Sequence, residues 1–300
     1  MLARGTTAAA LRARRWRLQT QQGLISALAN VAETPSALGP QDLVIVAVKG
    51  PSLASVAASV GPLLGPDAAV LTAMNGVPWW FFHGFGTAYR DLRLSSVDPK
   101  GEIESALPAR RIVGCVVHAS CSTPEPGLVR HHGGQRLIIG EPAGEPAPRT
   151  HAIAAQLIAA GFDVEVSSCI QRDIWYKLWG NMTMNPISAL TGATDGPHPR
   201  RRAGEEVLSC CDERGRGDRR ERSAVRSNKA ARTAIAVTRR LGAVKTSMLQ
   251  DVEAQRQVEI DVLLSAVREI GEQVEVATPD DRCAARAGAA AGEVQGLYPS

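Results

Sequence analysis

Three polar side chains recur at a helical spacing within an apolar stretch of the sequence. Lys177, Asn181 and Asn185 stand at positions i, i+4 and i+8, so on a helix they share one face. An ammonium and two carboxamides on an apolar helix cost free energy when they are buried without partners. The pattern indicates a polar ligand-binding site, and the alternative is a helix face that looks at solvent.

Aromatic and apolar side chains occupy the other faces of the same stretch. Trp175, Leu178, Trp179 and Met182 point away from the polar face and are free to pack. Together with Tyr176 they indicate a helix that is embedded on several sides. This favours a binding site over a solvated face.

A second segment, residues 245–263, carries further polar groups. Ser247 fits the N-cap of a helix, which is the ordinary interpretation of an isolated Ser-x-x-Gln that ends here at Gln250. Glu259 is a carboxylate between apolar neighbours, and an exposed helical glutamate is its ordinary explanation. These residues alone therefore leave their function open.

Strand and helix signals alternate through the first half of the chain. Short, valine-rich apolar runs predict buried parallel strands at 42–48 and 68–73, with a helix at 52–64 between them. Turn-flanked runs predict antiparallel strands at 111–118, 128–131 and 136–139. This order predicts a doubly wound sheet.

The pattern changes after the middle of the chain. A helix is expected at 149–160 and a strand at 163–166, which closes the first domain. From Cys169 onward the periodicity is helical only, in two long segments, 170–190 and 233–273. We therefore expect a Rossmann-like α/β domain over residues 1–167 and an all-α domain over residues 168–300. An active site between two such domains is the usual arrangement.

Composition excludes several other classes. No apolar run approaches the ~20 residues that span a bilayer, and no secretory signal is visible, so we expect no membrane partner. Six cysteines without a CxxC spacing favour free thiols in a reducing cytoplasm. The histidines show no spacing of a metal site, so no metal is predicted. A net charge of +4 argues neither for nor against nucleic acid by itself, and we expect no nucleic-acid partner.

Five phrases of the sequence match one family in order and approximate spacing. They are VAVKGPSL, LTAMNGV, RIVGCVVHAS, YKLWGNMTMNPISALTG and KTSMLQDVEAQRQVEID. With them the chain resembles the ketopantoate reductases, which reduce 2-dehydropantoate to pantoate with NADPH in the route to pantothenate and coenzyme A. The resemblance covers about residues 1–194 and 233–279.

The resemblance implies a role for each matching residue. Lys177 takes the position of the general acid and Glu259 that of the carboxylate that binds substrate and sets the charge on the lysine. The substrate-binding positions fall on Asn75, Asn181, Asn185 and Ser247. Lys49 and Asn75 match the edge shared by cofactor and substrate, and Arg4 matches the arginine that meets the 2′-phosphate of NADP.

The glycine-rich signature of a dinucleotide site is not found in the sequence. No G-x-G-x-x-G occurs, and Leu2 to Gly5 resembles the end of the family's second strand. We therefore expect a copy that lacks its first strand and glycine-rich turn, and that binds cofactor weakly. The basic run from Arg12 to Arg17 would lie on the next helix and strand, and the alternative is a nucleic-acid or targeting arm.

Two segments depart from the family. Residues 195–232 contain ten arginines and one lysine against seven acids and no aromatic residue, and residues 280–292 are rich in alanine, glycine and arginine. Because GC-rich codons read out of frame give these residue types, we interpret both segments as compensated frameshifts. The alternative is a true arginine-rich insertion that is disordered or binds an acidic partner.

Three functional hypotheses remain open. The chain is a ketopantoate reductase, a reductase of another small 2-keto acid, or an inactive copy without a catalytic function. A homodimer is one of the assemblies that the sequence allows.

Overall fold

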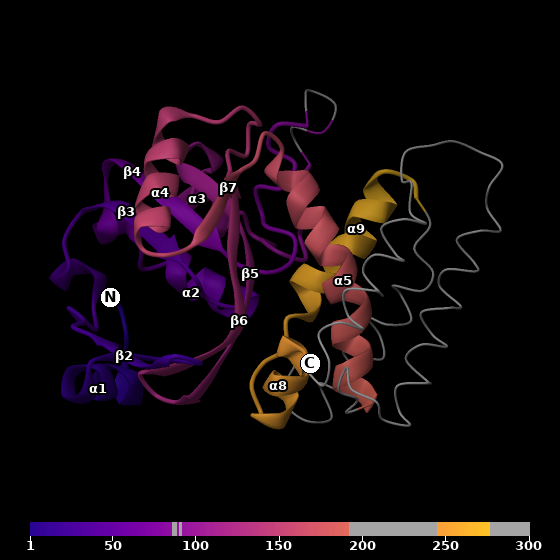
Figure 1. The fold of residues 1–300 in the computed structure, drawn as a ribbon. Helices are drawn as coiled ribbons and strands as arrows, with labels where there is room; N and C mark the ends of the chain where they lie inside the picture. The colour runs from indigo at the N-terminus through magenta and orange to yellow at the C-terminus, as the bar shows by residue number, and fades with distance from the viewer. Residues whose placement is uncertain (86–88, 90–91, 192–244, 277–300) are drawn as a thin grey trace.

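The computed structural model describes residues 1–85, 89, 92–191 and 245–276. An α/β unit precedes a helical part, and the two lie side by side in Figure 1. This confirms the expected fold class. The interpreted frameshift segments, 195–232 and 280–292, lie outside the described residues. The expected boundary between residues 167 and 168 stays a prediction, and the chain passes there from a last strand into the longest described helix.

The described residues form one seven-stranded sheet, in the order β2-β1-β6-β5-β4-β3 with β7 beside β6. The strands are β1 (Trp16–Thr20), β2 (Gly23–Ala27), β3 (Gln41–Val46), β4 (Leu64–Ala73), β5 (Ile112–Glu125), β6 (Leu128–Gly140) and β7 (Asp163–Val166). Strands β3, β4 and β5 are parallel, and β5 pairs antiparallel with β6. The two short strands expected at 128–131 and 136–139 are one strand.

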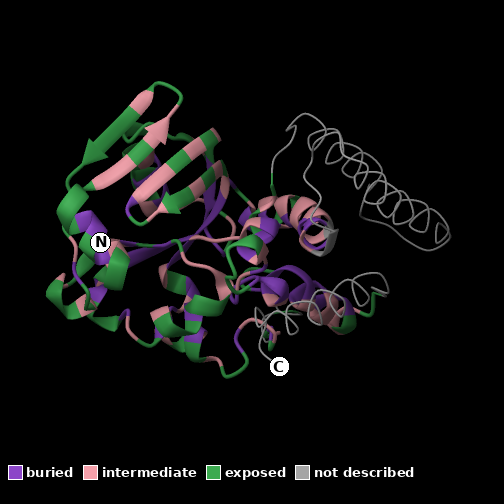
Figure 2. Ribbon diagram, turned by 90° about the horizontal axis from the view of Figure 1, so that it is seen from below, coloured by how far each residue is buried: buried purple, intermediate pink, exposed green. Residues whose placement is uncertain are grey.

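Burial follows the apolar runs of the sequence. The second half of β4 is buried on both faces, and so is the start of β5. In contrast, every residue of β1 and β2 is exposed or only partly buried, as the green and pink strands of Figure 2 show. The core therefore lies under the parallel strands, and the β1–β2 hairpin extends the sheet at its edge.

Helices cover the sheet and form the second part. They are α1 (Gly5–Arg14), α2 (Leu53–Ala57), α3 (Glu102–Ala106), α4 (Pro148–Ala159), α5 (Ile170–Thr191), α8 (Ser247–Glu253) and α9 (Ala266–Gln273), with a π-helix at Asp261–Ser265. Short 3-10 turns occur at Pro35–Ala37, Gly50–Ser52, Gly61–Leu63 and Ala109–Arg111.

Two of the expected helices are wrong in extent. The helix expected at 52–64 is limited to α2, because Gly61 and Pro62 favour a separate turn that leads into β4. The long helix expected at 233–273 is interrupted within its described part. After α8 the chain turns at Gln255, whose φ of 51° is left-handed, and it becomes helical again at Ile260.

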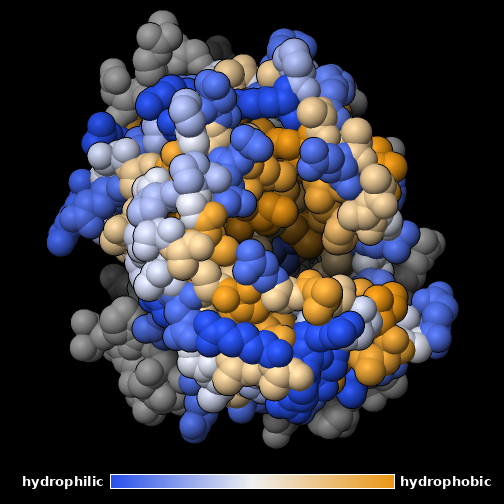
Figure 3. Space-filling model, turned by 90° about the vertical axis from the view of Figure 1, so that its left-hand side faces the viewer, coloured by the Kyte–Doolittle hydropathy of each residue, from blue (hydrophilic) through white to orange (hydrophobic). Residues whose placement is uncertain are grey.

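The N-terminal segment lies beside the sheet rather than within a named strand. Leu2 forms an isolated parallel bridge with Ala32, and α1 follows directly. The basic run then continues along α1 and β1, as expected. On this side of the molecule the surface is hollowed and lined by apolar residues (Figure 3). The apolar side chain of Ile45 in the edge strand β3 is 53% exposed.

Helix α5 joins the two parts through one stripe of apolar side chains. Ile170, Ile174 and Leu178 recur at intervals of four and are all buried in the core that also contains Trp80 and Val116. The helix is thereby fixed against β5. Lys177, one residue before Leu178, lies on the neighbouring face of the helix and reaches the backbone of Val117 in β5.

Hydrogen bonds clasp the α/β unit to the last helices. The carboxylate of Glu269 on α9 accepts from the backbone N–H groups of Ser95 and Ser96 at 2.7 and 2.9 Å, and from their hydroxyls at 2.7 and 2.6 Å. The backbone N–H of Val77 donates to the carbonyl of Val262 at 2.8 Å. These contacts hold the last helices against the α/β unit.

Candidate active site

The side chains of α5 lie mostly as its periodicity predicts. Leu178 is buried, and Trp175 and Met182 pack against the core. The ring of Trp175 lies 5.8 Å from that of Phe81. Tyr176 is 55% exposed, so the expectation that it helps to embed the helix is wrong. Its position lies on the side of α5 opposite to the apolar stripe.

Lys177 is the centre of the predicted cluster. Its Nζ donates to Asn75 Oδ1 at 2.7 Å and to the carbonyl of Val117 at 2.6 Å. The residue as a whole is only partly buried, but its ammonium is enclosed by protein. Burial lowers the pKa of Lys177 from 10.5 to about 8, against electrostatic attraction from Cys115 and Glu259, which raises it. The ammonium is therefore charged at neutral pH, but it is a much better proton donor than an exposed lysine.

Glu259 lies in the segment that follows α8 and faces the loop after β3. It is 6% exposed, and its Oε1 accepts the backbone N–H of Gly50 at 3.0 Å. The pKa of Glu259 is raised overall, because burial and the nearby charge of Asp251 outweigh the bond from Gly50 and the charges of Lys49 and Lys177, which lower it. The interpretation of Glu259 as an exposed helical glutamate is therefore wrong.

An ion pair between the α/β unit and α8 holds the side chain of Lys49. It follows β3 and pairs with Asp251 of α8, whose side chain is almost completely buried. A buried carboxylate needs such a partner, because an unpaired charge in the interior costs several kcal/mol. Lys49 therefore lies next to Gly50, whose N–H bonds to Glu259. Its expected position at the edge of the cofactor and substrate site stays a prediction.

Asn185 and Ser247 meet where α5 crosses α8. Asn185 is 5% exposed, and its Nδ2 lies 3.5 Å from Ser247 Oγ. The expected N-cap role of Ser247 is wrong: Thr246 is the N-cap, and its hydroxyl accepts from the N–H of Leu249 at 3.2 Å. The hydroxyl of Ser247 accepts instead from Asn185, and its own proton can still be donated to a ligand. Asn181 is partly buried on the turn between Lys177 and Asn185.

Arg4 does not join this cluster. It is the N-cap residue of α1, on the other side of the sheet from α5 (Figure 1), and its Nε donates to the carbonyl of Glu33 at 3.3 Å. Among the described residues no side chain caps the first turn of α1, and Arg4, Gly5 and Thr6 are exposed at this positive end of the helix.

Several groups of the site could not be found by inspecting residue types. The carbonyl of Val117 and the N–H of Gly50 are backbone atoms, which no side-chain pattern reveals. Asp251 was visible in the sequence, but its role as the buried partner of Lys49 was missed. Its apolar neighbours Met248 and Leu249 were the available signal, because they indicate a helix start that is buried.

Metal and membrane features are not observed in the described ranges. Within them, no three potential metal-ligating side chains lie close together. None of the helices described is both long and apolar enough to cross a bilayer. The expectation of no metal and no membrane stays a prediction for the whole chain.

Comparisons with known proteins agree on one family. Residues 1–144 match the family described as ketopantoate reductase PanE/ApbA, and residues 169–285 match its C-terminal part. A 2-dehydropantoate 2-reductase of Mesorhizobium japonicum is 39% identical over 289 residues, which are 93% of this chain and 85% of that protein.

Solved structures extend the likeness to the fold. A candidate ketopantoate reductase from Ralstonia solanacearum is 45% identical, with a TM-score of 0.88 over 99% of this chain and 91% of that one. A D-mandelate dehydrogenase, solved with NADH and anilino(oxo)acetate, is 17% identical with a TM-score of 0.72, covering 97% of this chain and 89% of its own. The second likeness shows the fold alone.

Proposed function

Because the chain belongs to the ketopantoate reductase family, a family of NAD(P)-dependent oxidoreductases that act on small keto acids, we propose that it reduces 2-dehydropantoate to pantoate with NADPH. The observation that carries this proposal is the buried ammonium of Lys177, held by Asn75 and Val117. An ammonium has three N–H donors. The two bonds found among the described residues leave one donor for a keto oxygen.

The proposed role of Lys177 is to donate a proton. Reduction of a ketone leaves negative charge on its oxygen, and a donor within hydrogen-bond reach both stabilises that charge and neutralises it. A pKa of about 8 suits this role, because the group is protonated at neutral pH and releases its proton readily.

Glu259 and the amides would hold the substrate. The negative charge of Glu259 favours the ammonium form of Lys177 and can accept a hydrogen bond from a substrate hydroxyl. Asn75, Asn181, Asn185 and Ser247 supply neutral donors for a carboxylate and hydroxyls. Such donors bind an anion without neutralising the catalytic lysine.

The residues present fit two parts of NADPH. Arg4 and the uncapped start of α1 would hold the 2′-phosphate, and Lys49 and Asn75 would border the nicotinamide end. When bound, the cofactor supplies the hydride that reduces the keto carbon. Preference for NADP over NAD rests on Arg4, because a guanidinium gains more from a phosphate than from a ribose hydroxyl.

Steady-state oxidation of NADPH by purified protein tests the proposal. We expect turnover with 2-dehydropantoate and a fall of about 10²–10⁴-fold in Lys177→Ala. Lys245→Ala, which removes an exposed lysine paired with Glu253, is the matched control and should keep its activity. Near-normal turnover in Lys177→Ala would refute the assignment.

A panel of other small 2-keto acids separates the two enzymatic hypotheses. The same lysine and amides would serve any such substrate. A higher kcat/KM for another keto acid would make that acid the proposed substrate in place of 2-dehydropantoate. If no keto acid is reduced and titration followed by NADPH fluorescence shows no binding, the chain is the inactive copy.

Location and assembly are part of the proposal. Cys115, Cys121 and Cys169 are free thiols, which supports a reducing cytoplasm. A homodimer is the assembly that we propose to test, by light scattering on the purified chain. A single species with the 31.8 kDa mass of one chain would overturn it.

A further inference from the structure

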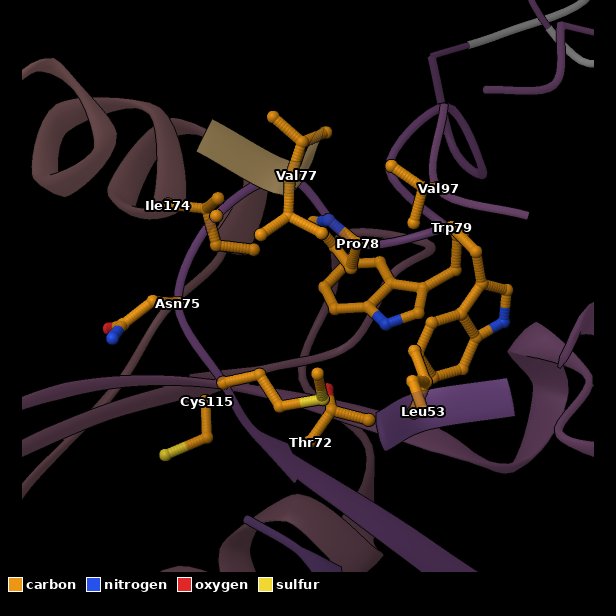
Figure 4. A pocket seen from close by; sticks show the side chains of 13 residues that line it. Leu53, Thr72, Asn75, Val77, Pro78, Trp79, Val97, Cys115 and Ile174 are labelled. Carbon is orange, nitrogen blue, oxygen red and sulfur yellow. The ribbon is translucent and has the colours of Figure 1, made fainter. Parts of the chain in front are cut away.

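A small cavity lies at the loop that carries Asn75, which is one of its lining residues. It is lined by the end of β4, the loop after it, β5, α5 and the π-helix, including Thr72, Met74, Trp80, Cys115, Ile174 and Val262. Its volume is about 20 Å³, enough for one water molecule and too little for a substrate or cofactor fragment. In Figure 4 the side chains of Asn75 and Cys115 both point away from Trp79, toward the opposite side of this cavity.

Two residues that line the cavity each have a buried polar atom without a hydrogen-bond partner among the described residues. The atoms are Thr72 Oγ1 and Trp80 Nε1, on residues that are 4% and 2% exposed. The neighbouring tryptophan differs, because Trp79 Nε1 donates to the carbonyl of Leu107 at 3.1 Å. Buried polar groups in folded proteins are nearly always satisfied by protein or by ordered water.

The two atoms belong to side chains that meet at one place in the sheet. Thr72 pairs with Gly114 in the register of β4 and β5. The six-membered ring of Trp80 lies on Gly114, since a Cβ at that glycine would stand 2.6 Å from Trp80 Cη2. Both residues also line the same cavity. One small molecule can therefore reach both of them.

We propose that this cavity is a binding site for one ordered water molecule, shared by Trp80 and Thr72. The indole N–H is a donor only, and a hydroxyl either donates or accepts. A molecule that accepts a hydrogen bond from Trp80 and exchanges one with the Thr72 hydroxyl would satisfy both groups. Water can do this and is small enough for the cavity. An ion is disfavoured, because burying an unpaired charge is costly and no charged side chain lines the cavity.

The site braces the end of β4. Thr72 stands three residues before Asn75 in the strand that delivers it to Lys177. The proposal concerns water binding by the free protein, so it does not rest on the proposed function. Its experiments need neither substrate nor cofactor.

A crystal structure of the full chain at a resolution that shows waters is the direct test. We expect a peak at about 2.7–3.2 Å from both Trp80 Nε1 and Thr72 Oγ1. An empty cavity, or a direct bond between the two side chains, would overturn the proposal.

Thermal unfolding gives a second test, whose sign distinguishes a wet cavity from a dry one. If water is bound, Thr72→Val removes one of its partners and should lower Tm by about 2–4 °C. If the cavity is dry, Thr72→Val removes an unsatisfied hydroxyl, so Tm is unchanged or rises. Thr150→Val is the control, because its buried hydroxyl bonds to Glu141 and its loss must lower Tm.

A double-mutant cycle tests whether the water is shared. Trp80→Phe removes the indole N–H and should also lower Tm. The two losses should be less than additive in Thr72→Val/Trp80→Phe if both groups bond one molecule. Fully additive losses would show that the two groups do not share a ligand.

Discussion

Replacing Lys177 by methionine should affect activity and stability in opposite directions. Methionine keeps much of the length of the side chain and removes the ammonium. As a proton donor the residue is worth about 10²–10⁴-fold in turnover. As a buried charge it also destabilises the fold, because burial lowers its pKa from 10.5 to about 8.

The magnitude follows from linkage between protonation and folding. A displacement of the pKa from 10.5 to about 8 corresponds to about 3 kcal/mol. Between these two pH values the unfolded chain binds more protons at Lys177 than the folded chain does. Stability of the wild type therefore rises with pH in this window. Below pH 8 both states are protonated, and the full cost of the buried ammonium is present.

The comparison with the variant isolates this cost. Lys177→Met also loses the bonds to Asn75 and Val117. A neutral lysine keeps two N–H donors, so the variant lacks these two bonds at every pH in the series. From pH 7 to pH 11 the unfolding free energy of the wild type should rise by about 3 kcal/mol relative to that of the variant. Urea unfolding at a series of pH values measures it, with Lys245→Met as the exposed control.

A difference that stays constant over this range would refute the reasoning, because the ammonium would then not be enclosed as the structure has it. The kinetic counterpart is kcat/KM for keto-acid reduction in the wild type. It should fall as pH rises through about 8, where Lys177 loses the proton that it must donate.

Three other substitutions test separate contacts. Glu259→Gln should weaken keto-acid use more than NADPH affinity, and unaltered kinetic constants would contradict its role. Arg4→Ala should lower the ratio of kcat/KM for NADPH to that for NADH, whereas an unchanged ratio would make Arg4 a surface residue only. Glu269→Gln should lower Tm at pH 7, because burial alone would raise the pKa of Glu269 but its bonds from Ser96 and Ser95 lower it overall. That stabilisation is present above the unfolded pKa near 4.5 and is lost as pH falls through the folded value, so the Tm difference should vanish in acid.

Periodicity predicted the elements that depend on local pattern. The buried strands β3 and β4 and the helix α5 follow directly from their apolar residues, and the spacing of Lys177, Asn181 and Asn185 placed them on one face. The local pattern was sufficient for α5 because the buried stripe of Ile170, Ile174 and Leu178 determines which side of the helix packs against the core.

Features set by tertiary contacts were not predictable from the sequence. The break after α8 depends on a left-handed residue, Gln255, and on packing of the following segment. Burial of Glu259 and Asp251 depends on the loop after β3, some 200 residues earlier, which supplies Gly50 and Lys49. No local pattern reports such a distant partner.

The π-helix at Asp261–Ser265 sets the angle between two glutamate side chains that lie ten residues apart and both bond to the α/β unit. Glu259 precedes it and bonds to Gly50, and Glu269 follows it and bonds to Ser95 and Ser96. A π-turn holds one residue more than an α-turn. Deleting a single residue here would rotate one carboxylate against the other by about 100°. The α/β unit could then bond to only one of the two carboxylates, so the length of this turn determines whether both contacts form at once.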